Sequence, residues 1–316
     1  MTCMLRPFLP TRPPAAIRVV KSRDIVDLLL LGALWGASFL FLRLAAPEFG
    51  PFALIEIRVG IGALVLLPLL AMHDGLATLK QGWKPVWMMG VLNSALPFCL
   101  LAFAALTISG GLAAILNSSS PLWAAVIAWV WMGERLNLSR VAGLVLGFCG
   151  VVVLMSDKFT LHSTGAALAI GAALLAALSY GFAANFARRY LTGLPSLAVA
   201  TGTQISATVL LAPFALARWP AHAVSSTAWW SAIVMGVAST GIAYILYFRL
   251  IAHVGAARAL AVTYLVPMFG IFWGALFLHE WPSGRELGGC AVILLGTAFA
   301  TGMLRLPARA VADGDR

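Results

Sequence analysis

Charged residues are scarce in this sequence, and their scarcity excludes an ordinary water-soluble protein. Of the 316 residues only 10% are Asp, Glu, Lys or Arg, whereas 61% are hydrophobic and the mean hydropathy is +0.95. A soluble domain carries roughly 25% charged residues, because its surface must face water. The composition therefore predicts a protein embedded in a membrane.

Motifs for disulfides, metals and several enzyme classes are also missing. The four cysteines form no C-x-x-C pair and no cluster with histidine, so we expect small apolar fillers, no disulfide framework and no metal site. The sequence has no G-x-x-x-x-G-K-[ST] phosphate loop, no H-E-x-x-H and no G-x-S-x-G. These absences argue against ATP hydrolysis and against an intramembrane enzyme, and we expect no cofactor.

The net charge of +10 does not indicate a nucleic-acid partner, because the basic residues lie between apolar runs. With a cytoplasmic N-terminus, sixteen Lys and Arg fall in cytoplasmic segments and three, Lys158, Arg218 and Arg285, in outer loops. Positive residues favour the cytoplasmic side. We therefore expect cytoplasmic N- and C-termini, with residues 1–24 and 305–316 as cytoplasmic tails and the first as disordered.

Ten apolar runs approach the roughly 20 residues that a helix needs to cross a bilayer. They span 25–45, 52–71, 85–107, 112–132, 141–156, 166–187, 197–217, 228–250, 256–278 and 287–304, the fifth and tenth being short. The runs are continuously apolar and do not alternate as strands of a membrane barrel do. The sequence predicts an all-α membrane protein.

The second half of the chain repeats the first. Pro121 and Pro267 are 146 residues apart, and the same offset relates Glu134 to Glu280, Gly143 to Gly289 and Gly150 to Gly296. Five spans per copy is an odd number, so the copies must cross the bilayer in opposite senses. We expect two inverted five-helix repeats, 25–156 and 165–304, joined by a periplasmic linker, 157–164. Inverted repeats favour a carrier, with a channel as the alternative.

The repeated passages resemble the EamA repeat of the drug/metabolite transporter superfamily. The resemblance rests on LLGALWGASFLFLRLA, GPFALIEIRVGIGALVLLPLL and SSSPLWAAVIAWVWMGERLNLSRVAGLVLGFCGVVVL, and on LVPMFGIFWGALFLHEWPSGRELGGCAVILLGTAFA in the second copy. It implies a ten-helix transporter of the bacterial inner membrane. It also implies a central cavity lined by spans one, three, four, six, eight and nine, and export of amino acids, other metabolites or toxic compounds.

Polar and aromatic residues at corresponding positions of the two copies are the candidate substrate ligands. They are Trp35, Asn93, Asn117, Ser118, Tyr180, Ser239, Thr240, Tyr244, Thr263 and Tyr264. Pro121 and Pro267 interrupt spans four and nine, and broken helices in matching positions point to a central site. The alternative for the hydroxyl and amide groups is a hydrogen bond to their own helix or to a neighbouring one.

Two charged positions are candidates for gating or structural roles. Arg58 lies about 10 Å along its helix from Phe52, so we expect it to reach the outer headgroups, with helix packing or a gate as the alternative. Glu134 follows span four and is predicted to organise the turn to span five. Glycines of spans five and ten are expected to support close helix packing, either within the chain or in a homodimer.

Together these features predict a secondary transporter that exports amino acids or similar small metabolites by alternating access. Glu56 is the one intramembrane carboxylate and it is shallow, so we expect facilitated transport down the solute gradient. The alternative is a proton-coupled efflux carrier for drugs or toxic compounds. The expected partners are the small-molecule substrate and the lipid bilayer.

Overall fold

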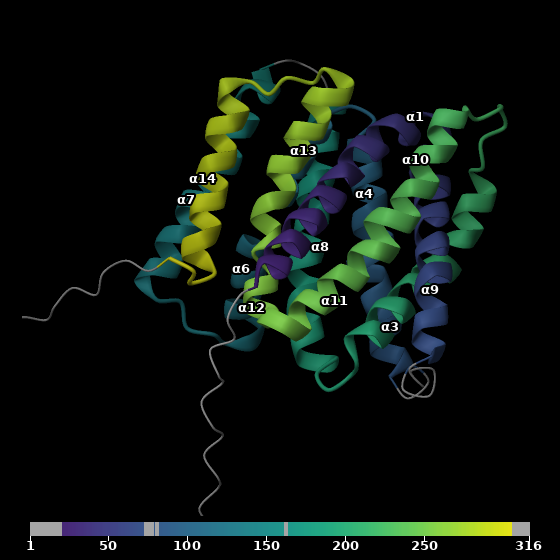
Figure 1. Cartoon of the computed structure of the whole chain (residues 1–316). Helices are drawn as coiled ribbons and strands as arrows, with labels where there is room; N and C mark the ends of the chain where they lie inside the picture. The colour runs from purple at the N-terminus through teal and green to yellow at the C-terminus, as the bar shows by residue number, and fades with distance from the viewer. Residues whose placement is uncertain (1–20, 73–78, 80–81, 161–163, 305–316) are drawn as a thin grey trace, which may run out of the picture.

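The computed structural model describes residues 21–72, 79, 82–160 and 164–304, and over these ranges the protein is a bundle of helices without strands (Figure 1). In lipid a helix satisfies its own backbone hydrogen bonds, which is why long apolar runs fold this way. The helices are α1 Ser22–Met72, α3 Trp83–Gly90, η1 Val91–Ala95, α4 Leu96–Ala104, α5 Gly110–Asn117, α6 Ser120–Met132, α7 Leu138–Thr160, α8 Thr164–Tyr190, α9 Ser196–Ala217, α10 Ser226–Gly236, η2 Val237–Ile242, α11 Ala243–Val254, α12 Ala256–Ala259, α13 Val262–Leu278 and α14 Gly284–Ala300.

Within the described ranges, 7 helices are long and apolar enough to cross a membrane, and α13 is a shorter apolar helix. The first of these, α1, is 51 residues long and is kinked at Gly50, whose φ of 71° lies in the left-handed region that glycine adopts at little cost. Pro47 and Pro51 flank the kink. The protein is therefore an all-helical, multi-pass membrane protein.

Several predicted boundaries need correction. The helix α7 runs from Leu138 to Thr160, so it begins three residues before the predicted fifth span, 141–156, and continues four residues past it into the predicted linker, whereas its candidate membrane span ends at Met155. The helix α1 begins at Ser22, inside the predicted tail 1–24. Residues 1–20 and 305–316 lie outside the described residues, so the disorder expected of the first tail is not tested.

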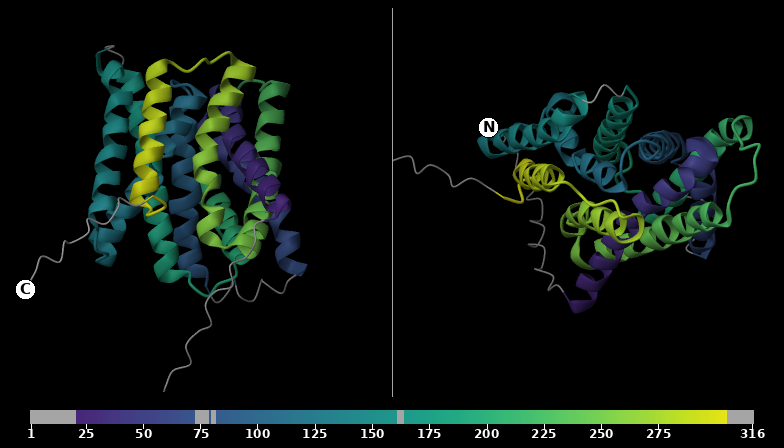
Figure 2. Two further views of the ribbon diagram at one scale, coloured as in Figure 1. Left: turned by 60° about the vertical axis from the view of Figure 1, so that its left-hand side comes forward. Right: turned by 90° about the horizontal axis from the view of Figure 1, so that it is seen from above.

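Side-chain contacts define the two ends of the bundle. At one end, Glu48 before the kink accepts hydrogen bonds from Ser225, between α9 and α10. At the other end, the Ser139 hydroxyl lies 3.5 Å from the Leu304 carbonyl oxygen. The start of α1 and the end of α14 lie toward the same end, the lower one in Figure 1 and in the left panel of Figure 2. We call this the tail end, and the end with the Gly50 kink the kink end.

Two irregular features recur at the predicted offset of 146 residues. The π-helices η1 and η2 begin at Val91 and Val237, each between two α-helical segments. The helices α6 and α13 both end on a residue with positive φ, Gly133 (69°) and His279 (55°). The next amide, of Glu134 or Glu280, donates to a carbonyl six residues earlier.

Glycines bring α7 and α14 into close contact. A Cβ on Gly143 would lie 2.6 Å from the Gly296 carbonyl oxygen, and one on Gly150 would lie 2.9 Å from Ile293. A Cβ on Gly289 would lie 2.6 Å from Leu154 of α7. The glycine faces of the fifth and tenth predicted spans are therefore used for packing inside one chain.

Candidate functional site

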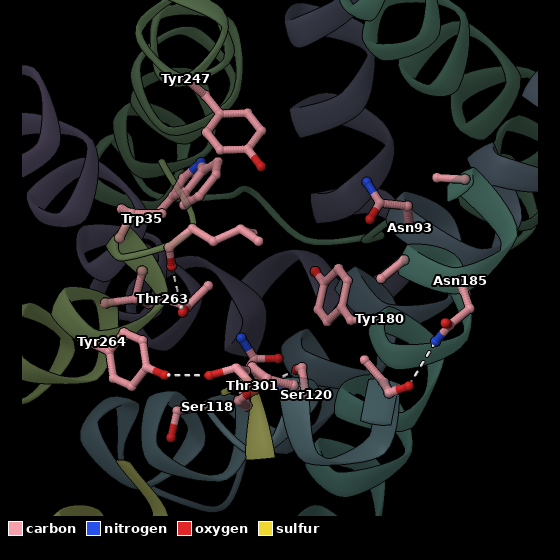
Figure 3. Close-up of a pocket in the computed structure, with 18 of the residues that line it drawn as sticks. Trp35, Asn93, Ser118, Ser120, Tyr180, Asn185, Tyr247, Thr263, Tyr264 and Thr301 are labelled. Carbon is pink, nitrogen blue, oxygen red and sulfur yellow. Dashed lines mark hydrogen bonds between the residues drawn. The ribbon is translucent and has the colours of Figure 1, made fainter. Parts of the chain in front are cut away.

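A cavity of about 970 Å³ lies within the bundle and includes Gly302 and Met303, at the tail end, in its lining. Figure 3 shows some of its lining side chains. The cavity wall includes Trp35 of α1 and the two prolines Pro121 and Pro267. It also includes Glu134, just after α6, and Arg188, near the end of α8. Its size lies within the usual range for small-molecule sites, about 300–1,000 Å³. A metabolite-sized solute therefore fits inside it.

Aromatic rings form much of the wall, on two sides of the cavity. Trp35 packs against Tyr247 and Tyr244 of α11, with ring centroids 5.4 Å and 6.5 Å apart. Tyr180 of α8 lies on the other side, 6.4 Å from the Phe98 ring (Figure 3). These faces suit the apolar part of a solute.

Polar groups from the irregular helices also line the cavity. Asn93, in η1, lies 3.4 Å from the Tyr244 hydroxyl, a long hydrogen bond. Ser239, in η2, and Asn117, at the end of α5, each have a buried side-chain oxygen without a partner among the described residues. Polar groups buried without partners cost free energy unless a ligand or water satisfies them. Thr240 lies in η2 beside Ser239 but does not line the cavity.

The other predicted hydroxyl ligands bond to the protein itself. The hydroxyl of Ser118 donates to the carbonyl of Ile115 at 2.6 Å, and that of Thr263 donates to the carbonyl of Leu260 at 2.8 Å. The hydroxyl of Tyr264 lies 3.3 Å from that of Thr301 (Figure 3). All three predicted residues line the cavity, and each hydroxyl has a partner within the protein while its oxygen can still accept a further hydrogen bond.

The expectation that Arg58 reaches the outer headgroups was wrong, whereas the alternative of a packing or gating role stays open. Its side chain does not extend to the outer headgroups, since the residue is only 5% exposed and lines the cavity. The Nε atom donates to Thr240 Oγ1 at 3.1 Å, and the guanidinium carbon lies 3.8 Å from the Phe98 ring centroid. Depth along α1 suggested a shallow position, but the rotation of the helix directs the side chain inward.

At the kink end a network of hydrogen bonds surrounds Glu280. Its Oε1 accepts from Arg43 Nε at 2.7 Å, and its Oε2 accepts from the Gly110 amide at 2.9 Å. Arg43 also donates to the carbonyl of Ala105 at 2.6 Å. None of these four residues is among those that line the cavity. We call Arg43, Ala105, Gly110 and Glu280 the kink-end latch.

At the tail end the corresponding carboxylate lies in the cavity mouth. Glu134 pairs with Arg188 of α8 at 2.5 Å and with Arg140 of α7 at 3.4 Å, and all three line the cavity. The hydrogen bond from Arg188 lowers the pKa of Glu134, against a smaller opposite effect of burial. Glu134 therefore links α7 and α8 at the cavity mouth. This contact with α8 is additional to the predicted role of Glu134 in the turn between α6 and α7.

Sequence reasoning missed several residues of the wall, among them Tyr247, Phe98, Ser38 and Asn185. Tyr247 follows the predicted ligand Tyr244 by three residues, a spacing that places both on one helix face and offered a usable signal. Asn185 is a buried amide in an apolar span, the same kind of signal that singled out Asn93. Ser38 and Phe98 have no comparable marker.

Comparisons with known proteins agree with this architecture. The model of the EamA-like transporter family matches residues 25–156 and again residues 167–302. A solved crystal structure superposes with a TM-score of 0.64 at 24% identity, covering 90% of this chain and 99% of its own, which supports the fold.

The alignments with curated relatives cover most of this chain and most of each relative. The uncharacterized transporter YvbV of Bacillus subtilis is 26% identical over 87% of this chain and 90% of its own. A probable terminal-alkyne amino-acid exporter of Streptantibioticus cattleyicolor is 25% identical over 87% and 92%. A probable amino-acid metabolite efflux pump of Escherichia coli is 23% identical over 88% and 94%. With two family matches that together span most of its length, the chain belongs to the EamA-like transporter family.

Proposed function

We propose that the protein exports amino acids or similar small metabolites across the bacterial inner membrane by alternating access. The observation that supports this proposal is the asymmetry of the cavity, which reaches the tail end, whereas the residues of the kink-end latch are bonded to one another and do not line it. A carrier must hold its solute in a site that is open to one side at a time. The conformation has the arrangement expected of the cytoplasm-facing state.

We further propose that the chain forms ten membrane helices in two inverted repeats, with both termini in the cytoplasm. The kink at Gly50 would divide α1 into two spans, and α13 and α14 would supply the last two. The matching π-helices and the matching αL ends of α6 and α13 support a duplicated unit. The positive charges of the loops support the orientation.

The two Glu–Arg pairs are proposed to be equivalent latches of the two repeats. Glu280 and Glu134 are 146 residues apart, and their partners Arg43 and Arg188 are related by nearly the same offset. The Arg43 and Glu280 side chains are 28% and 16% exposed, whereas those of Arg188 and Glu134 are 56% and 31% exposed. If the Arg188–Glu134 pair tightened while the Arg43–Glu280 pair loosened, the opening of the cavity would move from the tail end to the kink end.

Amino-acid-like solutes suit the cavity because it combines aromatic faces with amide and hydroxyl groups. Two of the relatives are named as probable amino-acid exporters or efflux pumps. The rival function, proton-coupled efflux of cationic drugs, would be favoured by a carboxylate deep in the cavity. Glu56 is not among the lining residues and Glu134 lies at the mouth, paired with arginines.

Counterflow into proteoliposomes tests the proposal. Vesicles preloaded with one unlabelled amino acid should take up the labelled form transiently, with saturation, across a panel of amino acids. Asn93→Ala and Asn117→Ala should reduce this exchange several-fold. Uptake above equilibrium that appears only with an imposed pH gradient would support the proton-coupled alternative, and steady ionic currents without counterflow would indicate a channel.

A further inference from the structure

Arg58 is a cation buried inside the helix bundle, with only 5% of the residue exposed. It lies eight residues after the Gly50 kink, about 12 Å along the helix at 1.5 Å per residue. Its side chain points into the bundle and is removed from solvent. A charged side chain buried within a membrane helix bundle is costly unless it is paired or functional.

No carboxylate neutralises Arg58 among the residues that the structure describes. The ion pairs there join Asp24, Asp27, Glu134 and Glu280 to other basic side chains. Within the same ranges the one hydrogen bond of the guanidinium is from Nε to Thr240, which leaves both terminal nitrogens, Nη1 and Nη2, without a hydrogen-bond partner. A guanidinium presents two parallel donors that match a carboxylate.

The surroundings hold the guanidinium in place and direct it toward the cavity. The Thr240 hydroxyl, fixed by its own bond to the Met235 carbonyl at 3.2 Å, fixes Nε. The Phe98 ring covers one face of the guanidinium at 3.8 Å. Tyr180 and Tyr244 lie within electrostatic range of it, and both line the cavity.

We propose that Arg58 binds the carboxylate of the transported solute, and that the carboxylate contributes more to binding than any amino group the solute carries. The proposal rests on the proposed function and specifies its substrate as an organic carboxylate with an apolar or aromatic body. Trp35 and Tyr247 supply faces for that body. Polar oxygens without partners on Asn117 and Ser239 lie in the same wall and add hydrogen-bonding capacity.

The charges of the cavity favour a solute with a carboxylate over one with only an ammonium group. The carboxylate of its wall is Glu134, at the mouth, where Arg188 and Arg140 already pair with it. A solute that offers only an ammonium group would therefore meet the unpaired Arg58 in the wall and, among the described lining residues, no free carboxylate. Like charges disfavour such a solute, whereas a free acid or a zwitterion compensates Arg58.

Three matched probes test the assignment by calorimetric titration of the purified full-length protein. They are phenylalanine, 3-phenylpropionate, which lacks the amino group, and 2-phenylethylamine, which lacks the carboxylate. The two carboxylates should bind at least about tenfold more tightly than the amine, as expected for a charge-assisted hydrogen-bonded pair. Equal or tighter binding of the amine, or no binding of either carboxylate, would overturn the proposal.

Variants separate the role of Arg58 from general damage. Arg58→Gln should weaken binding of both carboxylates at least about tenfold and leave the amine unchanged or tighter. Arg58→Lys keeps the charge but loses the paired donors, so its affinity for the carboxylates should lie between those of Arg58→Gln and the natural protein. Arg218→Gln, at an exposed position after α9, removes a charge away from the cavity and should bind as the natural protein does. All variants should elute as a single species in size-exclusion chromatography.

The binding data and the counterflow data can fail independently. Carboxylate binding that depends on Arg58 without any counterflow would contradict the proposed export and leave this assignment standing. Counterflow of amino acids by a protein whose binding is unaltered in Arg58→Gln and Arg58→Lys would contradict the assignment and leave export standing.

Discussion

Removing the carboxylate of Glu280 should open the kink end of the bundle. Glu280→Gln keeps the size of the side chain but removes the ion pair with Arg43 at 2.7 Å and weakens the bond from the Gly110 amide at 2.9 Å. A hydrogen bond to a charged group contributes about 1.5–3 kcal/mol. If the latch stabilises only the closed state, its loss raises the population open at the kink end by about 10- to 150-fold.

Thiol labelling from the outer face measures this change. Ser38 lines the cavity and is 5% exposed, so Ser38→Cys in a chain without the natural cysteines reports whether reagent reaches the site. In right-side-out vesicles a membrane-impermeant reagent should label Ser38→Cys faster when Glu280→Gln is present, in proportion to the open population. Arg43→Gln should act similarly, and the double substitution should add little, because both remove one interaction.

Glu286 provides a control at the same end of the bundle. Its carboxylate caps α14 by accepting from the Ser283 amide at 2.8 Å and takes no part in the kink-end latch. Glu286→Gln should leave the labelling rate of Ser38→Cys unchanged. If Ser38→Cys is labelled at the same rate with and without Glu280→Gln, the network around Glu280 does not hold the cavity closed, and the reasoning fails.

Three further results are expected. Gly296→Ala should lower the thermal unfolding midpoint, because overpacking at the α7–α14 contact costs about 1–3 kcal/mol, whereas Gly288→Ala on the same helix meets open space and should not; equal midpoints would contradict this packing. Glu56→Gln should leave counterflow intact, since Glu56 does not line the cavity, and abolished exchange would refute facilitated transport. Arg188 lowers the pKa of Glu134 from 4.5, so the pair stabilises the fold above that value and loses this effect only as the pH falls below it. The difference in thermal unfolding midpoint between Glu134→Gln and the natural protein should therefore stay constant from about pH 8 to about pH 6. A change in that range would contradict the Glu134–Arg188 pair.

The membrane class and the family were predictable from the sequence. Long apolar runs need no tertiary information, because lipid requires internally hydrogen-bonded helices. The prolines and glutamates at one offset also marked residues that the fold uses in equivalent ways. Pro121 and Pro267 both line the cavity, and Glu134 and Glu280 each pair with an arginine of another helix.

Details that depend on packing were not predictable. The segments of η1 and η2, VLNSA and VASTGI, carry no sequence pattern from which a π-helix could be predicted. Arg58 illustrates the same limit. Its distance along α1 followed from the sequence, but the direction of its side chain depends on how α1 is rotated against η2 and α4. The salt-bridge partners of Glu134 and Glu280 needed the folded arrangement too.

Cross-linking across the kink-end latch tests the central claim most directly. A chain with Arg43→Cys and Glu280→Cys, joined by a bifunctional thiol reagent with a reducible linker, should bind solute from the tail end yet carry out no counterflow. Reduction of the linker should restore exchange. Unchanged counterflow in the cross-linked protein would mean that solute crosses without opening the kink end, and would contradict a cavity that faces each side of the membrane in turn.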